Sequence, residues 1–236
     1  FPENHRFQVP EGCHWKDVRG KSANIGHALQ KAMRSIEQAN PDTLHGIFGD
    51  AQWTNKDRLP DHMLRELIEH FSSQTLSLSN CPEDELGVGY EFLIKKFADD
   101  SGHTAAEFYT NRTVVRLMTL IMDPKPGESV YDPTCGSASL LIKAGQQVED
   151  NNFSLYGQEA NGSTWALAMM NMFLHGFDNA SIRWGDTLRN PKHTKGDNLM
   201  KFDTVVANPP FSVKSWSNGF HPESDIYKRF DGFGIP

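Results

Sequence analysis

The chain has 236 residues, of which 38% are hydrophobic, and a formal net charge of −7. That length allows one large or two modest domains with a buried core. A free-standing DNA-binding protein normally carries a basic face, so a role on DNA would need another subunit to supply most of the phosphate contacts. No apolar stretch is long enough to span a membrane and no secretory leader is visible, so we expect a cytoplasmic protein without a membrane partner.

The three cysteines, Cys13, Cys81 and Cys135, show no metal-ligand spacing. They cannot all pair within one chain, which favours a reducing compartment. No pair of histidines has a convincing metal spacing either, so we expect no metal site. The chain opens on Phe1 rather than Met, and we interpret it as a fragment of a longer protein.

Residues 1–80 show helical periodicity without strand alternation. Ser22-Ala23-Asn24 precedes an apolar stripe over 25–36, and Asn40-Pro41 predicts the end of that helix. Leu59-Pro60-Asp61 predicts the start of a second helix, with one side formed by Met63, Leu64, Leu67, Ile68 and Phe71. The polar segment 72–85 contains a proline and is the candidate boundary. We therefore predict a helical N-terminal domain over 1–80 and a second domain over 81–236.

The second domain begins with a helix predicted over 86–97, with Tyr90, Leu93, Ile94 and Phe97 facing inward. From residue 111 helices and short strands alternate: the predicted helices are 114–122, 137–148 and 164–174, and the predicted strands are 129–131, 153–156, 181–184 and 204–207. Such alternation is typical of a doubly wound parallel sheet, an α/β fold. The polar stretch 190–198 is expected to form a loop.

The last of these strands runs into Asn208-Pro209-Pro210-Phe211. Two prolines cannot donate to a sheet ladder, so the backbone leaves the sheet here, at the carboxyl end of a strand, where open α/β sheets bind ligands. The Asn208 oxygen and the Pro209 carbonyl are two acceptors suited to the N–H bonds of an adenine 6-amino group, and Phe211 can stack on the base. A proline-rich turn that merely ends the strand is the simpler alternative.

Between the first strand of this domain and its helix lies the loop Asp132-Pro133-Thr134-Cys135-Gly136-Ser137-Ala138. Gly136 allows a tight turn, and the helix start exposes unpaired N–H groups to an anion. The loop lacks both the P-loop lysine and the dinucleotide glycine pattern. A ligand with a cationic centre and a carboxylate fits better, and S-adenosylmethionine has both.

Two further acidic residues end successive strands. Glu159 is placed to accept hydrogen bonds from ribose hydroxyls and Asp186 to bind an adenine amino group. A single acid at such a position is more often a helix cap, but three in order, with Asn208 on the next strand, favour a site.

Upstream, Thr110 or Asn111 could bind ligand or simply cap the next helix, and Phe108 and Tyr109 could be ordinary core. Beyond Asn208-Pro209-Pro210-Phe211, the side chains of Trp216 and Phe220 could line a base pocket or pack on a part of the protein that is absent from this chain.

Together these segments resemble the modification (methyltransferase) subunit of type I restriction–modification systems, an N6-adenine DNA methyltransferase of the γ motif order. The matching stretches are 107–110 with Arg112, 132–137, 157–159, 165–176, 185–188 and 208–211. The resemblance implies a Rossmann-like S-adenosylmethionine-dependent methyltransferase sheet, incomplete in this chain, after a helical N-terminal domain. Two residues depart from the family: Asn111 replaces the usual proline and Ala138 the usual glycine. Ala138 adds a methyl group close to the expected cofactor path, which would weaken cofactor binding if its backbone needs positive φ.

The resemblance also implies site roles. The catalytic loop is Asn208, Pro209, Pro210 and Phe211; the cofactor-binding residues are Phe108, Tyr109, Thr110, Asp132, Thr134, Gly136, Ser137, Glu159, Asp186, Thr187 and Leu188. The implied partners are DNA, a specificity subunit, a second modification subunit and a separate restriction subunit. Two rivals remain: methylation of RNA or of a protein glutamine by the same loop chemistry, and an assembly subunit that keeps the fold without catalysis.

Overall fold

The computed structural model describes residues 6–76, 80–81, 83–101, 109–148, 152–211 and 219–232. They form two compact units, Phe1–Pro82 (unit 1) and Glu83–Pro236 (unit 2). Within the described ranges, no helix combines the length and apolar character that a membrane crossing requires.

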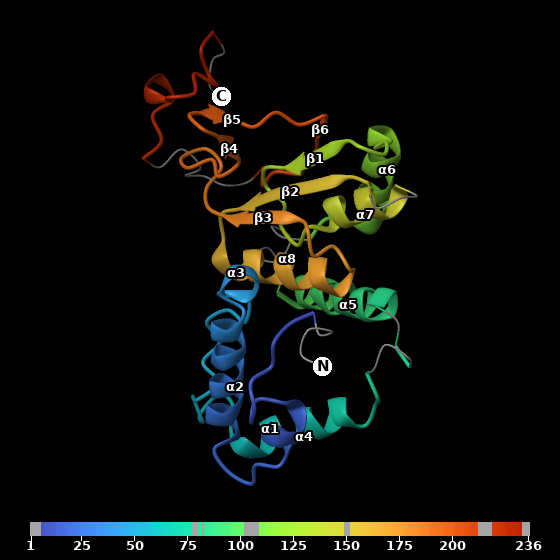
Figure 1. The fold of residues 1–236 in the computed structure, drawn as a ribbon, viewed down its shortest axis with the longest axis vertical. Helices are drawn as coiled ribbons and strands as arrows, with labels where there is room; N and C mark the ends of the chain where they lie inside the picture. The colour runs from blue at the N-terminus through green and yellow to red at the C-terminus, as the bar shows by residue number, and fades with distance from the viewer. Residues whose placement is uncertain are drawn as a thin grey trace. The chain divides into compact units, whose positions relative to one another are not determined.

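Unit 1 consists of helices in its described part (Figure 1): α1 Trp15–Arg19, α2 Ile25–Ala39, α3 Pro41–Leu44 and α4 Asp61–Ser72. The two long helices begin where the sequence predicts. The predicted cap of α2 acts differently, because Asn24 makes no side-chain capping bond. The Asp61 carboxylate accepts instead from the backbone N–H groups of Asn24 and Ile25, both at 2.9 Å, and these bonds lower its pKa.

The buried face of α4 is narrower than its apolar stripe. Leu64 and Ile68 are buried with residues of α1 and α2. Met63, Leu67 and Phe71, on the flanks of the same stripe, are between 43% and 48% exposed. Over its 12 residues, α4 thus contributes two buried residues to this core.

Unit 2 contains a parallel sheet and two layers of helix. Its strands are β1 Ser129–Asp132, β2 Ser154–Glu159, β3 Ser181–Trp184 and β6 Thr204–Val205, and its helices are α5 Glu83–Ser101, α6 Arg112–Met122, α7 Ser139–Gln147 and α8 Gly162–Leu174. Helices α7 and α8 pack on the strands, with α6 against α7 and α5 against α8. A short 3-10 helix, η3 Pro222–Ser224, follows near the C-terminus. The predicted α/β class is confirmed.

The strand order is β3-β2-β1-β6, with all neighbours parallel. The chain winds outward from β1 through β2 to β3 and then returns to the other side of β1. The crevice between β1 and β6 is therefore a topological switch point, where ligands bind in open α/β sheets. Asp132 ends β1, and Asn208 lies shortly after β6, so the two predicted ligand-binding loops flank this crevice.

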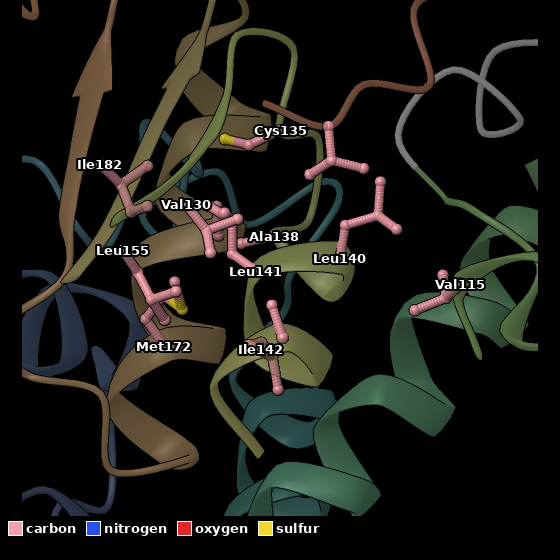
Figure 2. Packing of buried hydrophobic residues seen from close by; sticks show 13 residues of the cluster. Val115, Val130, Cys135, Ala138, Leu140, Leu141, Ile142, Leu155, Met172 and Ile182 are labelled. Carbon is pink, nitrogen blue, oxygen red and sulfur yellow. The ribbon is translucent and has the colours of Figure 1, made fainter. Parts of the chain in front are cut away.

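The hydrophobic core of unit 2 lies between the strands and the α7–α8 layer (Figure 2). Val130, Leu155 and Ile182, one from each of three adjacent strands, point toward Leu141 of α7. Leu141 is completely buried. On the other side of the sheet, the rings of Tyr131, Tyr156, His193 and Phe202 pack against one another at centroid distances of 4.5–6.1 Å.

Three predictions need correction. The stretch 190–198 is not only a loop, because β4 Thr194–Lys195 and β5 Asn198–Leu199 form a small antiparallel ladder. In α5, Ile94 is buried as predicted, but Leu93 and Phe97 are 42% and 60% exposed, so their inward placement is wrong. Strand β6 is also shorter than predicted, although Val206 N still donates to Tyr131 O at 2.9 Å.

Candidate active site

The Asp132 carboxylate occupies a buried position at the end of β1, only 1% exposed. Its Oδ1 accepts from Thr134 N at 3.0 Å, which folds the loop back on the strand. Burial raises the pKa of Asp132 to about 7, and the nearby Glu159 carboxylate adds to the rise. A buried acid held in this way is a common feature of functional sites.

After this turn the chain enters α7 through Ala138, which has φ +65° and ψ +17° and is fully buried. The family that the sequence resembles usually has a glycine at this position, and the backbone of Ala138 does adopt the left-handed conformation that glycine favours. Ala138 provides no side-chain cap. The first N–H groups of α7 therefore receive no side-chain cap from Ala138 and can donate hydrogen bonds to an anionic group.

Glu159, the last residue of β2, connects the β1 loop to the start of α8. Its Oε2 accepts from Gly136 N at 3.0 Å and its Oε1 from Asn161 N at 2.8 Å. Burial raises its pKa, and these backbone bonds oppose the rise. Each carboxylate oxygen has a further lone pair, so Glu159 can still accept from ligand hydroxyl groups.

The segment Asp186-Thr187-Leu188 forms the third side of the site. Asp186 Oδ1 accepts from Leu188 N at 2.9 Å, and Thr187 Oγ1 donates to Pro133 O at 2.6 Å. The segment that follows β3 is thus joined directly to the β1 loop. The structure brings together the three carboxyl-terminal strand ends that the sequence predicts.

Two buried amide side chains support this arrangement, and sequence reasoning assigned neither of them a role. Gln158 Nε2 donates to the carbonyls of Gly185 and Asn190, and its Oε1 accepts from Lys192 N, all within 3.0 Å. Asn171 Nδ2 on α8 donates to Ser137 O at 2.9 Å. Both residues lie in stretches that resemble the family, but nothing in the local pattern reveals which backbone groups they bind.

The Asn208 loop lies on the opposite side of the switch point from these carboxylates. Asn208 Nδ2 donates to Thr110 Oγ1 at 3.2 Å, a contact between residues 98 positions apart. Thr110 therefore reaches the site, whereas Asn111 caps α6 by accepting from Thr113 N. Pro209 and Pro210 are exposed. Phe211 is 88% exposed, so its ring face is open to a partner.

The remaining predicted residues have different positions. Phe108 and Trp216 lie outside the described residues. Tyr109 lines a pocket of about 470 Å³ beside residues of α5, α6 and α7, including Arg112 and Ser139. Phe220 lines a smaller pocket of about 290 Å³ with Leu188, and it packs edge-on against Phe230.

The charges of the site suit a cationic ligand. Asp132 and Glu159 are both desolvated and adjacent, and in the described part of the chain no lysine, arginine or histidine pairs with either carboxylate. A bound cation would relieve this repulsion. The residues therefore fit a cofactor with a cationic sulfur or ammonium group, hydroxyl groups for Glu159 and a carboxylate for the start of α7.

Comparison with known proteins agrees with this geometry. The N-6 DNA Methylase family matches residues 82–234, and the HsdM N-terminal domain family matches residues 1–71. The MpnII type I restriction enzyme methylase subunit of Mycoplasma pneumoniae is 38% identical over 228 residues, which cover 89% of this chain and 41% of the relative. The MjaIX methylase subunit of Methanocaldococcus jannaschii is 31% identical over 208 residues, 86% of this chain and 36% of the relative.

Among solved structures, the type I restriction–modification system methyltransferase subunit from Streptococcus thermophilus matches with a TM-score of 0.81 and 28% identity, over 99% of this chain and 52% of that chain. The chain spans about half, or less, of the length of each of these three relatives. The family matches cover nearly all of the sequence. The chain belongs to the N-6 DNA methylase family and, within it, to the methylase subunits of type I restriction enzymes.

Proposed function

We propose that this chain is the catalytic part of a DNA methyltransferase subunit that transfers a methyl group from S-adenosylmethionine to the N6 amine of a flipped adenine. The observation that carries the proposal is the pairing of two loops across one switch point. The buried Asp132 ends β1 and the half-buried Glu159 ends β2 on one side, and the Asn208-Pro209-Pro210-Phe211 loop follows β6 on the other. Cofactor and base would thus meet between adjacent strands.

On the cofactor side, the Asp132 carboxylate faces the cationic end of the cofactor. Glu159 accepts from the ribose hydroxyls, and Asp186 binds the adenine amino group. The first turn of α7, with Thr134, Gly136 and Ser137 before it, holds the carboxylate, and Tyr109 and Thr110 close the methionine end. When bound, S-adenosylmethionine supplies an electrophilic methyl group on a positively charged sulfur.

On the target side, Asn208 Oδ1 and the Pro209 carbonyl accept the two N–H bonds of the adenine 6-amino group. These bonds would favour the tetrahedral form of the nitrogen, whose lone pair would then be available to the methyl group that bound S-adenosylmethionine would supply. The contact to Thr110 uses an N–H of the Asn208 amide, which leaves the oxygen for the substrate. Phe211 stacks on the base, and its open ring face supports this role.

Residues 1–80 would form a helical N-terminal domain and 81–236 the methyltransferase domain. The net charge of −7 supports a division of labour in which another subunit holds the DNA. By their names, the relatives are subunits of type I restriction enzymes. We therefore propose as partners DNA, a specificity subunit, a second modification subunit and a restriction subunit.

Calorimetric titration with S-adenosylmethionine tests the proposal. We expect the chain to bind, Asp132→Ala and the isosteric Asp132→Asn to lose binding, and Asp197→Asn, at an exposed acid of the β4–β5 turn, to bind normally. Labelled methyl transfer to DNA, RNA and protein then identifies the substrate. Transfer to RNA or to a protein glutamine in place of DNA would overturn the substrate assignment, and a folded chain that binds no cofactor would support an assembly subunit.

A further inference from the structure

The segment that follows the catalytic loop is fastened to the Asp186 loop by one arginine. Arg229 Nη1 donates to Thr187 O at 2.8 Å, and Arg229 Nη2 donates to Leu188 O at 2.5 Å. Thr187 and Leu188 precede Arg229 by about forty residues, so the contact joins two separate regions of unit 2. The Arg229 side chain is only 19% exposed.

Asp225 fixes the guanidinium in this position. Its carboxylate accepts from Arg229 Nε at 3.0 and 3.2 Å and from Nη2 at 2.8 Å, and it also accepts from Arg229 N at 2.7 Å. The Asp225 side chain is 4% exposed. The rings of Phe220, Tyr227 and Phe230 lie 5.3–6.0 Å from the guanidinium carbon. This is a built contact, because a buried, bidentate pair with stacked rings defines both distance and direction.

The same loop carries the carboxylate assigned to the cofactor adenine. Asp186 Oδ1 accepts from the N–H groups of Leu188 and Arg189 at 2.9 and 3.3 Å, so its position depends on the peptide groups of 187–189. Arg229 binds the carbonyls of two of those residues. Gln158 holds only the two ends of the loop, at Gly185 and Asn190. The middle of the loop is held at the Thr187 side chain by Pro133 O and at the carbonyls of Thr187 and Leu188 by Arg229, from the 219–232 side.

We propose that Arg229 is a positioning residue that couples cofactor binding to the docking of residues 219–232, a segment that follows the Asn208 loop in the chain. The inference rests on the proposed function, since it takes Asp186 as a cofactor contact. When Asp186 is held by ligand, the carbonyls of Thr187 and Leu188 are presented to Arg229, and the segment docks more tightly. By thermodynamic linkage, docking of the segment strengthens cofactor binding by the same factor. Cofactor occupancy would thus prepare the side of the site that receives the base.

A lysine cannot replace this arginine. Its single ammonium group cannot donate in parallel to two carbonyls and a carboxylate, as the planar fork does. Arg229→Lys therefore keeps the charge and removes the geometry. Arg58→Lys is the matched control, because Arg58 is an exposed arginine of unit 1.

The experiment combines calorimetric titration with S-adenosylhomocysteine and hydrogen exchange, on the whole chain. We expect Arg229→Lys to weaken binding about tenfold, within the usual range of coupling between sites, and Arg58→Lys to change it less than about twofold. In the wild type, the ligand should slow amide exchange in 219–232. In Arg229→Lys that slowing should be lost, although the variant still binds ligand at saturating concentration. A merely structural role would lower stability without abolishing this ligand-dependent change.

The outcomes separate the two proposals. Equal affinity of wild type and Arg229→Lys, or equal ligand-induced protection of 219–232 in both, would overturn the coupling and leave the proposed function intact. A wild-type chain that binds no ligand would overturn both. If Arg229→Lys fails to fold, Asp225→Asn removes the support of the guanidinium while keeping Arg229 itself, and it should give the same loss in weaker form.

Discussion

The two sides of the candidate site are built differently. The cofactor side is partly buried, with Asp132 at its centre, and it is joined by hydrogen bonds among the Asp132, Glu159 and Asp186 segments, from Gly136 N to Glu159 and from Thr187 to Pro133. The target side is exposed, and within the described residues its Asn208 side chain makes one hydrogen bond, to Thr110 Oγ1. The difference indicates that internal hydrogen bonds already fix the cofactor side, whereas the groups of the target side are open to solvent and to a base. Substitutions on the two sides should therefore separate binding from transfer.

The largest effect is expected at Asn208. Asn208→Ala removes one of the two acceptors for the target amine, and loss of one such preorganised contact costs about 10²–10³-fold in rate. Within the described residues Asn208 joins the cofactor side through one bond, from its Nδ2 to Thr110 Oγ1, and it makes no bond to the Asp132, Glu159 or Asp186 segments. Cofactor affinity should therefore stay within about twofold. The measurement is methyl incorporation into DNA beside calorimetric cofactor binding. A loss of cofactor binding in this variant would refute the separation of the two sides.

The cofactor side should show its own pH dependence. The pKa of Asp132 is raised from 3.8 to about 7, so between these values the folded state holds a proton that the unfolded state has lost. The free energy of unfolding therefore falls as pH rises through that window, by at most about 4 kcal/mol. A bound cation favours the charged carboxylate, so cofactor affinity should instead rise with pH toward neutrality and above.

Thermal unfolding between pH 5 and 8 measures this slope directly. Asp132→Asn should lose it, and Asp197→Asn should keep it. Parallel curves for the wild type and Asp132→Asn would mean that the buried carboxylate does not titrate in this range.

The next effect concerns the helices beneath the cofactor side. A Cβ added at Gly87 of α5 would lie 2.5 Å from the ring of His175, the C-cap of α8. Helix α8 also carries Asn171, which holds the Ser137 carbonyl. Gly87→Ala should lower the free energy of unfolding by about 1–3 kcal/mol through overpacking and weaken cofactor binding with it.

Gly89→Ala is the matched control on the same helix, since nothing lies within 4 Å of its added Cβ. It should be neutral or stabilise by up to about 1 kcal/mol through helix propensity. Chemical denaturation of both variants makes the test. Equal effects of the two substitutions would show that the contact between α5 and α8 does not constrain the cofactor side.

The sequence predicts most of the sheet and the strand-end carboxylates because both are local signals. The short apolar strands and the acidic residues at or just after the ends of β1, β2 and β3 are adjacent in the chain. Arg229, Gln158 and Asn171 escape prediction because they act through backbone groups of distant segments, and such contacts leave no periodicity. The apolar stripe of α5 predicts Leu93 and Phe97 inward, but the stripe is wider than the face that is buried, and both side chains are exposed. The β4–β5 ladder is too short to show alternation.

The smallest predicted effect concerns the backbone strain at Ala138, at the start of α7. Ala138 holds φ +65° although it has a Cβ, which costs roughly 1–2 kcal/mol in this conformation. Ala138→Gly should therefore raise the free energy of unfolding by about 0.5–1 kcal/mol, after the larger entropy of glycine in the unfolded chain is subtracted. Ala144→Gly, the same change inside α7 at an equally buried position, should lower it by at least that amount. Denaturant titration of both variants measures the two changes in the free energy of unfolding. Changes of opposite sign would show that backbone strain at the start of α7, rather than side-chain volume, sets the cost of Ala138. Destabilisation by both substitutions would show that the Ala138 methyl group contributes more through packing than its φ angle costs.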